Sequence, residues 1–358
     1  MVNRFLVLFA IIIGGIFPQD FSRVKEAAGA YISSGGMEII ASDDRLTVNH
    51  PVSGKITQQL TGVKKIIPSP SGTFFLLLNF GFQPDKSDYP VSLFLVSRSS
   101  GLIYTKDITA SFDLPHPLFA VDDNGVIYSF EPLRMILSSD LRGSITETAV
   151  VENAEFTMER TFFLKAGSAS VTGASNILGR DDAGENIVLF TYTPADGNIQ
   201  SVRLKGSTLS GFDEAGGQLL LSVNRESESG VYPETRLMNT DFTESITLAE
   251  PAIYMLTPDR FITRQGKITG RDGSSFASPL PGSVKAVTGV YTLDETKTLL
   301  TAVTGAGNEF FIYDTASGAI RKADGISAGK DSRMEIFIFG RTLFAVENYV
   351  KTTIYQIN

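Results

Sequence analysis

One short turn sequence recurs along the chain, each time between two runs of β-branched and aromatic residues. The turns are Ser53-Gly54, Ser100-Gly101, Arg142-Gly143, Asp196-Gly197, Phe242-Thr243, Asp272-Gly273 and Ser317-Gly318. Short apolar runs of about four to eight residues, bounded by Gly, Asp, Asn and Pro, are typical of strands joined by tight hairpins. The sequence therefore predicts an all-β chain.

The spacing of these turn pairs indicates a repeat. They follow one another at about 44 residues on average, and a period of about 40–45 residues with four strands is typical of a β-propeller blade. We expect a single β-propeller over residues 31–358, with seven blades of four antiparallel strands, or alternatively eight. The predicted inner strands begin near Val63, Leu118, Phe156, Leu209, Ile253, Val290 and Met334.

The two ends of the predicted propeller both contain a strand-like segment. These are Met37–Ala41 near the amino terminus and Thr353–Ile357 at the carboxy terminus. An unpaired sheet edge invites association with other chains. We therefore expect the amino- and carboxy-terminal strands to pair in one closing blade.

Two turns carry a resemblance to a known family. Pro68-Ser69-Pro70-Ser71-Gly72-Thr73-Phe74, and later Asp314-Thr315-Ala316-Ser317-Gly318, resemble the WD40-like and YVTN-type repeats of bacterial propellers. The chain contains no Trp, so the Trp-Asp dipeptide of true WD40 repeats is missing. The resemblance implies a propeller fold but no particular activity, because propellers serve as enzymes, scaffolds and receptors alike.

The first residues differ in kind from the rest of the chain. A short basic start is followed by an unbroken apolar or glycine stretch, Phe5–Phe17, which ends at Pro18. A membrane span needs about 20 apolar residues, so we interpret residues 1–20 as a secretory signal peptide, with cleavage between residues 17 and 30. Ala28-Gly29-Ala30 fits the small-x-small cleavage rule but lies far from the apolar stretch. A retained anchor and a buried helix are the alternatives.

The composition limits the cellular compartment and the classes of binding partner that we expect. The chain has no cysteine, which removes a lipoprotein anchor and disulfides, and it has no Asn-x-Ser/Thr sequon. We therefore expect an exported bacterial protein, periplasmic or secreted. Its net charge of −8 argues against nucleic acid, since binding to nucleic acid relies on Lys and Arg at the phosphates.

Candidate catalytic groups are few. Gly325-Ile326-Ser327-Ala328-Gly329 matches the Gly-x-Ser-x-Gly pattern, but a nucleophile elbow needs a helix after it, and a strand is expected here. His50 and His116 are the only histidines. We therefore predict no catalytic residue, no cofactor and no metal.

Three carboxylate pairs fall in predicted turns, at Asp43-Asp44, Asp122-Asp123 and Asp181-Asp182. Asp and Asn cap turns through their own backbone, so a structural role is expected for all three. Calcium binding is the alternative, because such loops supply the oxygen ligands that calcium takes.

The longest interval between turn pairs, from Gly143 to Gly197, contains an apparent insertion rich in Gly, Ser, Ala and Asp. Insertions in repeat proteins often form the binding surface. The predicted binding residues are Lys165, Ser168, Ser170, Asn176, Arg180, Asp181, Asp182 and Asn186. We further expect that a short Gly-Ser linker can replace residues 167–184 without loss of the fold.

Two functions follow. The favoured one is an exported, non-enzymatic propeller that binds another protein or a cell-envelope component as a scaffold. The alternative is a hydrolase or lyase acting on a glycan or peptide with carboxylates at the central channel. Convergent Asp, Glu, Arg and Tyr at the channel would favour the enzyme, and an apolar or aromatic patch on the rim would favour the binder.

Overall fold

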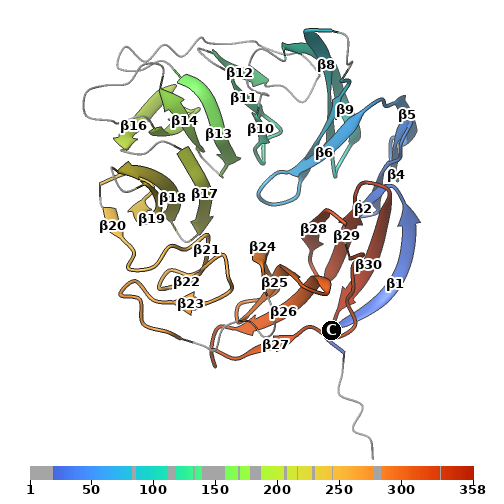
Figure 1. Cartoon of the computed structure of the whole chain (residues 1–358). Helices are drawn as coiled ribbons and strands as arrows, with labels where there is room; N and C mark the ends of the chain where they lie inside the picture. The colour runs from blue at the N-terminus through green and yellow to red at the C-terminus, as the bar shows by residue number, and fades with distance from the viewer. Residues whose placement is uncertain are drawn as a thin grey trace, which may run out of the picture.

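The structure is a computed structural model and shows a ring of small antiparallel sheets (Figure 1). It describes residues 19–82, 86–111, 118–131, 134–138, 158–167, 170–177, 187–204, 208–215, 217–227, 230–243, 245–276, 280, 284–330 and 332–358. Every regular element in these ranges is a strand. Among the described residues there is therefore no long apolar helix that could cross a membrane.

The first four sheets around the ring follow the chain order, and we call each sheet a blade. Blade 1 contains β2 (Ala30–Ser34), β3 (Met37–Ala41), β4 (Arg45–His50) and β5 (Gly54–Gln59). Blade 2 contains β6 (Val63–Pro68), β7 (Phe74–Phe80), β8 (Asp88–Ser97) and β9 (Gly101–Ser111). Blade 3 contains β10 (Leu118–Val121), β11 (Ile127–Glu131) and β12 (Arg134–Ser138). Blade 4 contains β13 (Met158–Ala166), β14 (Val171–Ile177), β15 (Ile187–Thr193) and β16 (Asn198–Leu204).

The remaining sheets complete the ring. Blade 5 contains β17 (Thr208–Ala215), β18 (Gln218–Ser227), β19 (Gly230–Asn239) and β20 (Ser245–Thr247). Blade 6 contains β21 (Tyr254–Thr257), β22 (Arg260–Ile262) and β23 (Ile268–Thr269). Blade 7 contains β24 (Ala286–Thr292), β25 (Lys297–Thr304), β26 (Gly307–Asp314) and β27 (Ile320–Lys322). Blade 8 contains β28 (Met334–Phe339), β29 (Thr342–Glu347), β30 (Lys351–Ile357) and, outermost, β1 (Phe21–Ala28).

The propeller fold and its four-stranded antiparallel blade are confirmed, and the described strands form eight sheets, which is the alternative count. All the inner strands expected from the sequence are present, as β6, β10, β13, β17, β21, β24 and β28. The additional inner strand is β2. A turn pair marks the hairpin between the third and fourth strands of a blade, as at Gly54 between β4 and β5. Blade 8 has no such hairpin, because its fourth strand is β1, and the turn pair Arg142-Gly143 lies outside the described residues.

Closure of the ring by its two terminal strands is confirmed, with one correction. β1 pairs with β30, with Phe21 opposite Ile357 and Ala28 opposite Lys351. The prediction that Met37–Ala41 shares this blade is wrong, because that segment is β3 of blade 1. β1 was missed because Phe21 is its one fully buried residue, so it lacks the alternation that reveals a strand.

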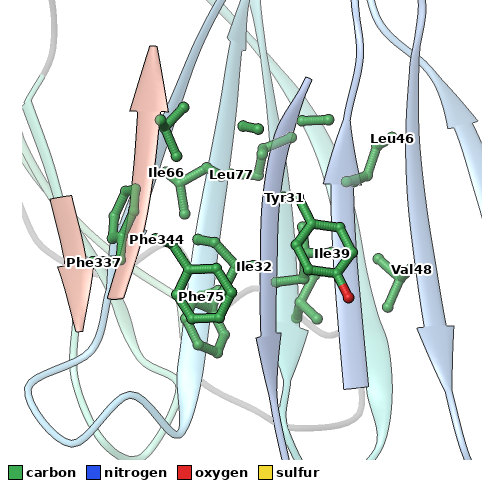
Figure 2. Close-up of a cluster of buried hydrophobic side chains, with 14 of the residues drawn as sticks. Tyr31, Ile32, Ile39, Leu46, Val48, Ile66, Phe75, Leu77, Phe337 and Phe344 are labelled. Carbon is green, nitrogen blue, oxygen red and sulfur yellow. The ribbon is translucent and has the colours of Figure 1, made fainter. Parts of the chain in front are cut away.

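The hydrophobic core is distributed around the ring, in clusters between neighbouring sheets. One cluster joins blades 8, 1 and 2, where Phe344, Ile32 and Phe75 lie together (Figure 2). All three are at most 1% exposed. Full burial of such a side chain contributes about 1.5–3 kcal/mol. Because each blade shares its core with its neighbours, we expect the stability of every blade to depend on an intact ring.

Candidate functional site

The predicted binding segment does not form a single loop. Lys165 belongs to β13 and Asn176 to β14, while Ser170 lies in the turn between these strands. Val171 and Ala174 of β14 are at most 1% exposed, so this strand is part of the core. The other predicted positions lie outside the described residues: Ser168, Arg180, Asp181, Asp182 and Asn186.

The Lys165 side chain contacts the neighbouring blade. Its Nζ donates a hydrogen bond to the Glu214 carbonyl at 3.2 Å and lies 3.7 Å from Glu214 Oε2. Glu214 belongs to β17, the inner strand of the next blade. Lys165 therefore links blades 4 and 5.

His50, the histidine that the structure describes, uses both ring nitrogens in contacts with the backbone. His50 Nδ1 accepts hydrogen bonds from the amides of Val52 at 3.2 Å and Ser53 at 3.1 Å. Its Nε2 faces the Arg98 carbonyl at 3.2 Å, so Nε2 carries the proton. His50 therefore closes the β4–β5 hairpin. His116 lies outside the described residues.

The Gly-x-Ser-x-Gly segment lies between β27 and β28, and the element that follows it is a strand. Ser327 is held by its backbone, because the Tyr355 hydroxyl donates to its carbonyl at 3.1 Å and accepts from its amide at 3.3 Å. The geometry is that of an anchored connection between blades 7 and 8.

The carboxylate pair in the β10–β11 turn has the structural role expected. Asp122 Oδ1 accepts from the amides of Asn124 at 2.9 Å and Val126 at 2.8 Å. Asp123 Oδ1 accepts from the Ser71 amide at 2.9 Å, which joins blades 2 and 3. Asp44 pairs with Arg45, and Asp181-Asp182 lies outside the described residues. Within the described ranges, no three His, Cys, Asp or Glu side chains are grouped as metal ligands.

The inner strands of blades 4 to 7 have a feature that the sequence did not reveal. Each contains a shift of register against its neighbour, typical of a β-bulge. The shifts lie between Thr161 and Phe163, Leu209 and Gly211, Met255 and Thr257, and Val287 and Gly289. The inner strands β2, β6, β10 and β28 pair without a shift. Bulges are over-represented beside active sites, where they redirect side chains, so this half of the ring is one candidate site.

Asp213 and Tyr254 lie on two of these bulged strands. Asp213 Oδ2 accepts from the Met255 amide at 2.8 Å, and Oδ1 accepts from the Glu214 amide at 2.9 Å. Burial raises the pKa of Asp213 above its ordinary value, against the opposing effect of these two hydrogen bonds. The Tyr254 hydroxyl donates to the Thr288 carbonyl at 3.1 Å, and burial, with the Asp213 charge, raises its pKa.

The row continues across blades 7 and 8. Tyr291 folds over Gly289, where an added Cβ would lie 2.6 Å from the tyrosine hydroxyl. Burial, assisted by Tyr254 and Glu335, raises the pKa of Tyr291 to about 12. Asp213, Tyr254, Tyr291 and Glu335 thus form a row of electrostatically linked groups on four consecutive inner strands.

Tyr349 ends this row at the β29–β30 turn. Its hydroxyl donates to Glu335 Oε2 at 2.5 Å and accepts from the Ile66 amide at 2.9 Å. Burial and the neighbouring Glu335 raise the pKa of Tyr349. Asp213 and Tyr349 therefore each accept a hydrogen bond from a backbone amide on the inner strand of another blade. The inner edge of a blade needs such acceptors, because its outward-facing amides have no neighbouring strand to bond.

The rim carries a different candidate at blade 5. Of the eight large apolar side chains that are exposed among the described residues, three belong to this blade: Val231 at 64%, Tyr232 at 45% and Ile246 at 42%. β20 pairs with Arg236–Met238 and so does not extend along the first half of β19. Pro233, also exposed, lies in this half, as is usual for edge strands. The apolar run from Val231 to Pro233 was a signal available in the sequence.

Comparison with known proteins places the chain by its fold. No family model and no curated protein matches it. A solved structure described as the Dos1 propeller is similar over 94% of this chain and 95% of that one, with a TM-score of 0.60 and 9% identity. The acylaminoacyl peptidase of Pyrococcus horikoshii is similar over 80% of this chain but only 49% of its own, with a TM-score of 0.52 and 12% identity. Similarity at such low identity shows a β-propeller fold alone.

Proposed function

We propose that this chain is an exported β-propeller that binds another protein through the rim of blade 5 and has no catalytic activity of its own. The observation that carries the proposal is the exposed apolar tip of the β18–β19 hairpin, formed by Val231, Tyr232 and Pro233 in the half of β19 that β20 does not reach. An exposed apolar patch rimmed by polar residues is typical of a protein-binding surface, and Tyr is enriched in such surfaces.

The hairpin that carries this patch is held in place by charged side chains. Glu234 accepts from Arg225 NH1 at 2.8 Å and from Arg236 Nε at 2.5 Å. The bond from Arg225 connects β18 with β19 directly below the tip, and the bond from Arg236 fixes Glu234 from within β19. A surface fixed before binding loses less conformational entropy when a partner arrives, which favours affinity.

The test compares the patch with equally exposed apolar residues elsewhere. The double variant Val231→Ser, Tyr232→Ser should retain the melting temperature but lose capture of a partner identified from the native cell envelope. The control variant Val52→Ser, Val350→Ser changes side chains that are 86% and 61% exposed on blades 1 and 8. It should bind as the unmodified protein does. Equal capture by both variants would contradict the assignment of the surface.

Export is part of the proposal and is supported by the apolar stretch Phe5–Phe17 behind a short basic start. Fractionation of native cells tests it. Recovery of the protein only from the cytoplasm, with Met1 intact, would contradict export while leaving the binding surface open to its own test.

A hydrolase or lyase acting on a glycan or peptide is the second candidate, because bulged inner strands and the row from Asp213 to Glu335 are the features that an enzyme would use. In the structure both Asp213 oxygens accept backbone amides. A carboxylate engaged in this way is a poor general base. Turnover of a glycan or peptide that is abolished by Asp213→Asn would favour the enzyme over the binder.

A further inference from the structure

The chain that immediately follows the apolar stretch is part of the folded ring. Both carboxylate oxygens of Asp20 pair with the Arg321 guanidinium, and Oδ2 also accepts from the Asp324 amide at 3.0 Å. The amide of Asn358 donates to the Asp20 carbonyl at 3.0 Å, and its side chain donates to the Gln19 carbonyl at 2.7 Å. Gln19 and Asp20 thus join blade 7 to the last residue of the chain.

Phe21 is the buried anchor of the closing strand. It is 0% exposed, and its ring lies edge-on to Tyr355 at 6.4 Å between centroids. Its amide donates to the Asp324 carbonyl at 3.1 Å. The following residues of β1 are mostly exposed, and the strand lies along β30 at the outside of blade 8 (Figure 1).

The Gly-x-Ser-x-Gly segment lies directly across this anchor. Gly325 has a φ of +83°, and a Cβ on it would lie 1.8 Å from the Phe21 carbonyl oxygen. At the other end, the Gly329 amide donates to Glu347 Oε2 at 3.3 Å, and its carbonyl accepts from Asn308 at 2.9 Å. Only glycine allows the loop to pass so close to the strand.

We infer that the processed chain retains every residue from Gln19 onward, and that the Gly325–Gly329 loop is a clamp that holds this new amino-terminal strand in the closing blade. The inference rests on the proposed export. Cleavage after Ala30 would remove all of β1, expose the edge of β30 and leave Arg321 without Asp20. The small-x-small sequence Ala28-Gly29-Ala30 therefore connects β1 to β2 within the folded ring and is not the processing site.

The amino terminus of protein from the native host tests the processing site. Mass spectrometry should find a first residue at or before Gln19. The variant Ala28→Gln, at an exposed position of β1, removes the small residue that cleavage after Ala30 requires. It should be processed at the same bond as the unmodified chain. A folded, monomeric chain that begins at Tyr31 would overturn the inference, whereas an intact Met1 would contradict export and still agree with retention of the strand.

Limited proteolysis of the full chain tests the clamp. Gly325→Ala should release β1 and speed cleavage within residues 21–28 at least tenfold. The control Gly340→Ala has the same kind of backbone, with a φ of +58°, but its Cβ meets nothing within 4 Å, so it should not speed cleavage. If Gly325→Ala does not fold, Asp20→Asn with Arg321→Gln loosens the same anchor and is measured in the same way. Unchanged cleavage in a folded Gly325→Ala variant would overturn the clamp, and unchanged cleavage in the double variant would overturn the anchoring of β1 at Asp20.

Discussion

Tyr349 joins blades 8 and 2, whose sequences are far apart in the chain, through a single hydroxyl group. The residue has a φ of 57° and follows Asn348, with a φ of 51°. Non-glycine residues with such backbones are uncommon and persist where surrounding contacts hold them. Here the hydroxyl lies between Glu335 of blade 8 and the Ile66 amide of blade 2.

Tyr349→Phe tests this contact at constant shape. The variant leaves the Ile66 amide without its acceptor, so the free energy of unfolding should fall by about 1–3 kcal/mol. Denaturant unfolding measures the change. Tyr232→Phe, at an exposed tyrosine, is the control and should leave stability unchanged.

Asp20 makes part of the stability dependent on pH. Burial alone would raise its pKa, but the hydrogen bonds from Arg321 and Asp324 and the Arg321 charge hold it below its ordinary value of 3.8. A lowered folded pKa adds stability that is complete above the unfolded pKa and is lost as pH falls through the folded value. The unmodified chain should therefore exceed Asp20→Asn in stability at neutral pH, and the difference should shrink below about pH 4. Urea unfolding across this range checks the sign, and a difference that grows toward acid would contradict it.

Single residues were predictable where their role is local. Asp122 caps a turn formed by its own neighbours, and turn chemistry identified it. The row from Asp213 to Tyr349 was not predictable, because its members come from separate blades and meet only when the ring forms. Tyr349 and Ile66 are 283 residues apart in the chain.

The strands also divide into those that the local sequence reveals and those that it does not. Inner strands such as β6 and β24 are rich in β-branched residues, and the sequence predicts them near their observed positions. β1 is largely exposed and lies between the predicted signal peptide, residues 1–20, and the predicted propeller, residues 31–358. The apparent insertion after Gly143 resembles a loop in the sequence because Gly, Ser and Ala obscure the alternation of β14, although Val171, Ala174 and Ser175 are buried.

The structure changes the result that we expect when a short Gly-Ser linker replaces residues 167–184. Replacing residues 167–184 by a short Gly-Ser linker removes β14, which pairs with both β13 and β15. The variant should lose cooperative unfolding or aggregate, because two core-bearing strands lose their partner. Thermal melting and size-exclusion chromatography measure this. A linker that replaces only the turn, residues 167–170, is the control and should fold.

At the scale of the whole molecule, the ring closes with strands from both ends of the chain. Deleting Lys351–Asn358 removes β30, which lies between β29 and β1. We expect loss of a single cooperative melting transition, because both neighbours lose their hydrogen-bonded partner. Removing Asn358 alone is the milder control. Unchanged melting of the longer deletion would mean that the ring does not depend on this blade.

The meeting of the two ends also sets when the ring can form. Asn358 donates a hydrogen bond to Ser22 across 336 residues of sequence. Contacts of such long range are slow to form, since the closure entropy of the intervening chain must be overcome first. β1 must therefore wait until β30 has been synthesised before it can pair. Under the proposed export, the ring would stay open until β30 has crossed the membrane, so the chain would pass before blade 8 is complete.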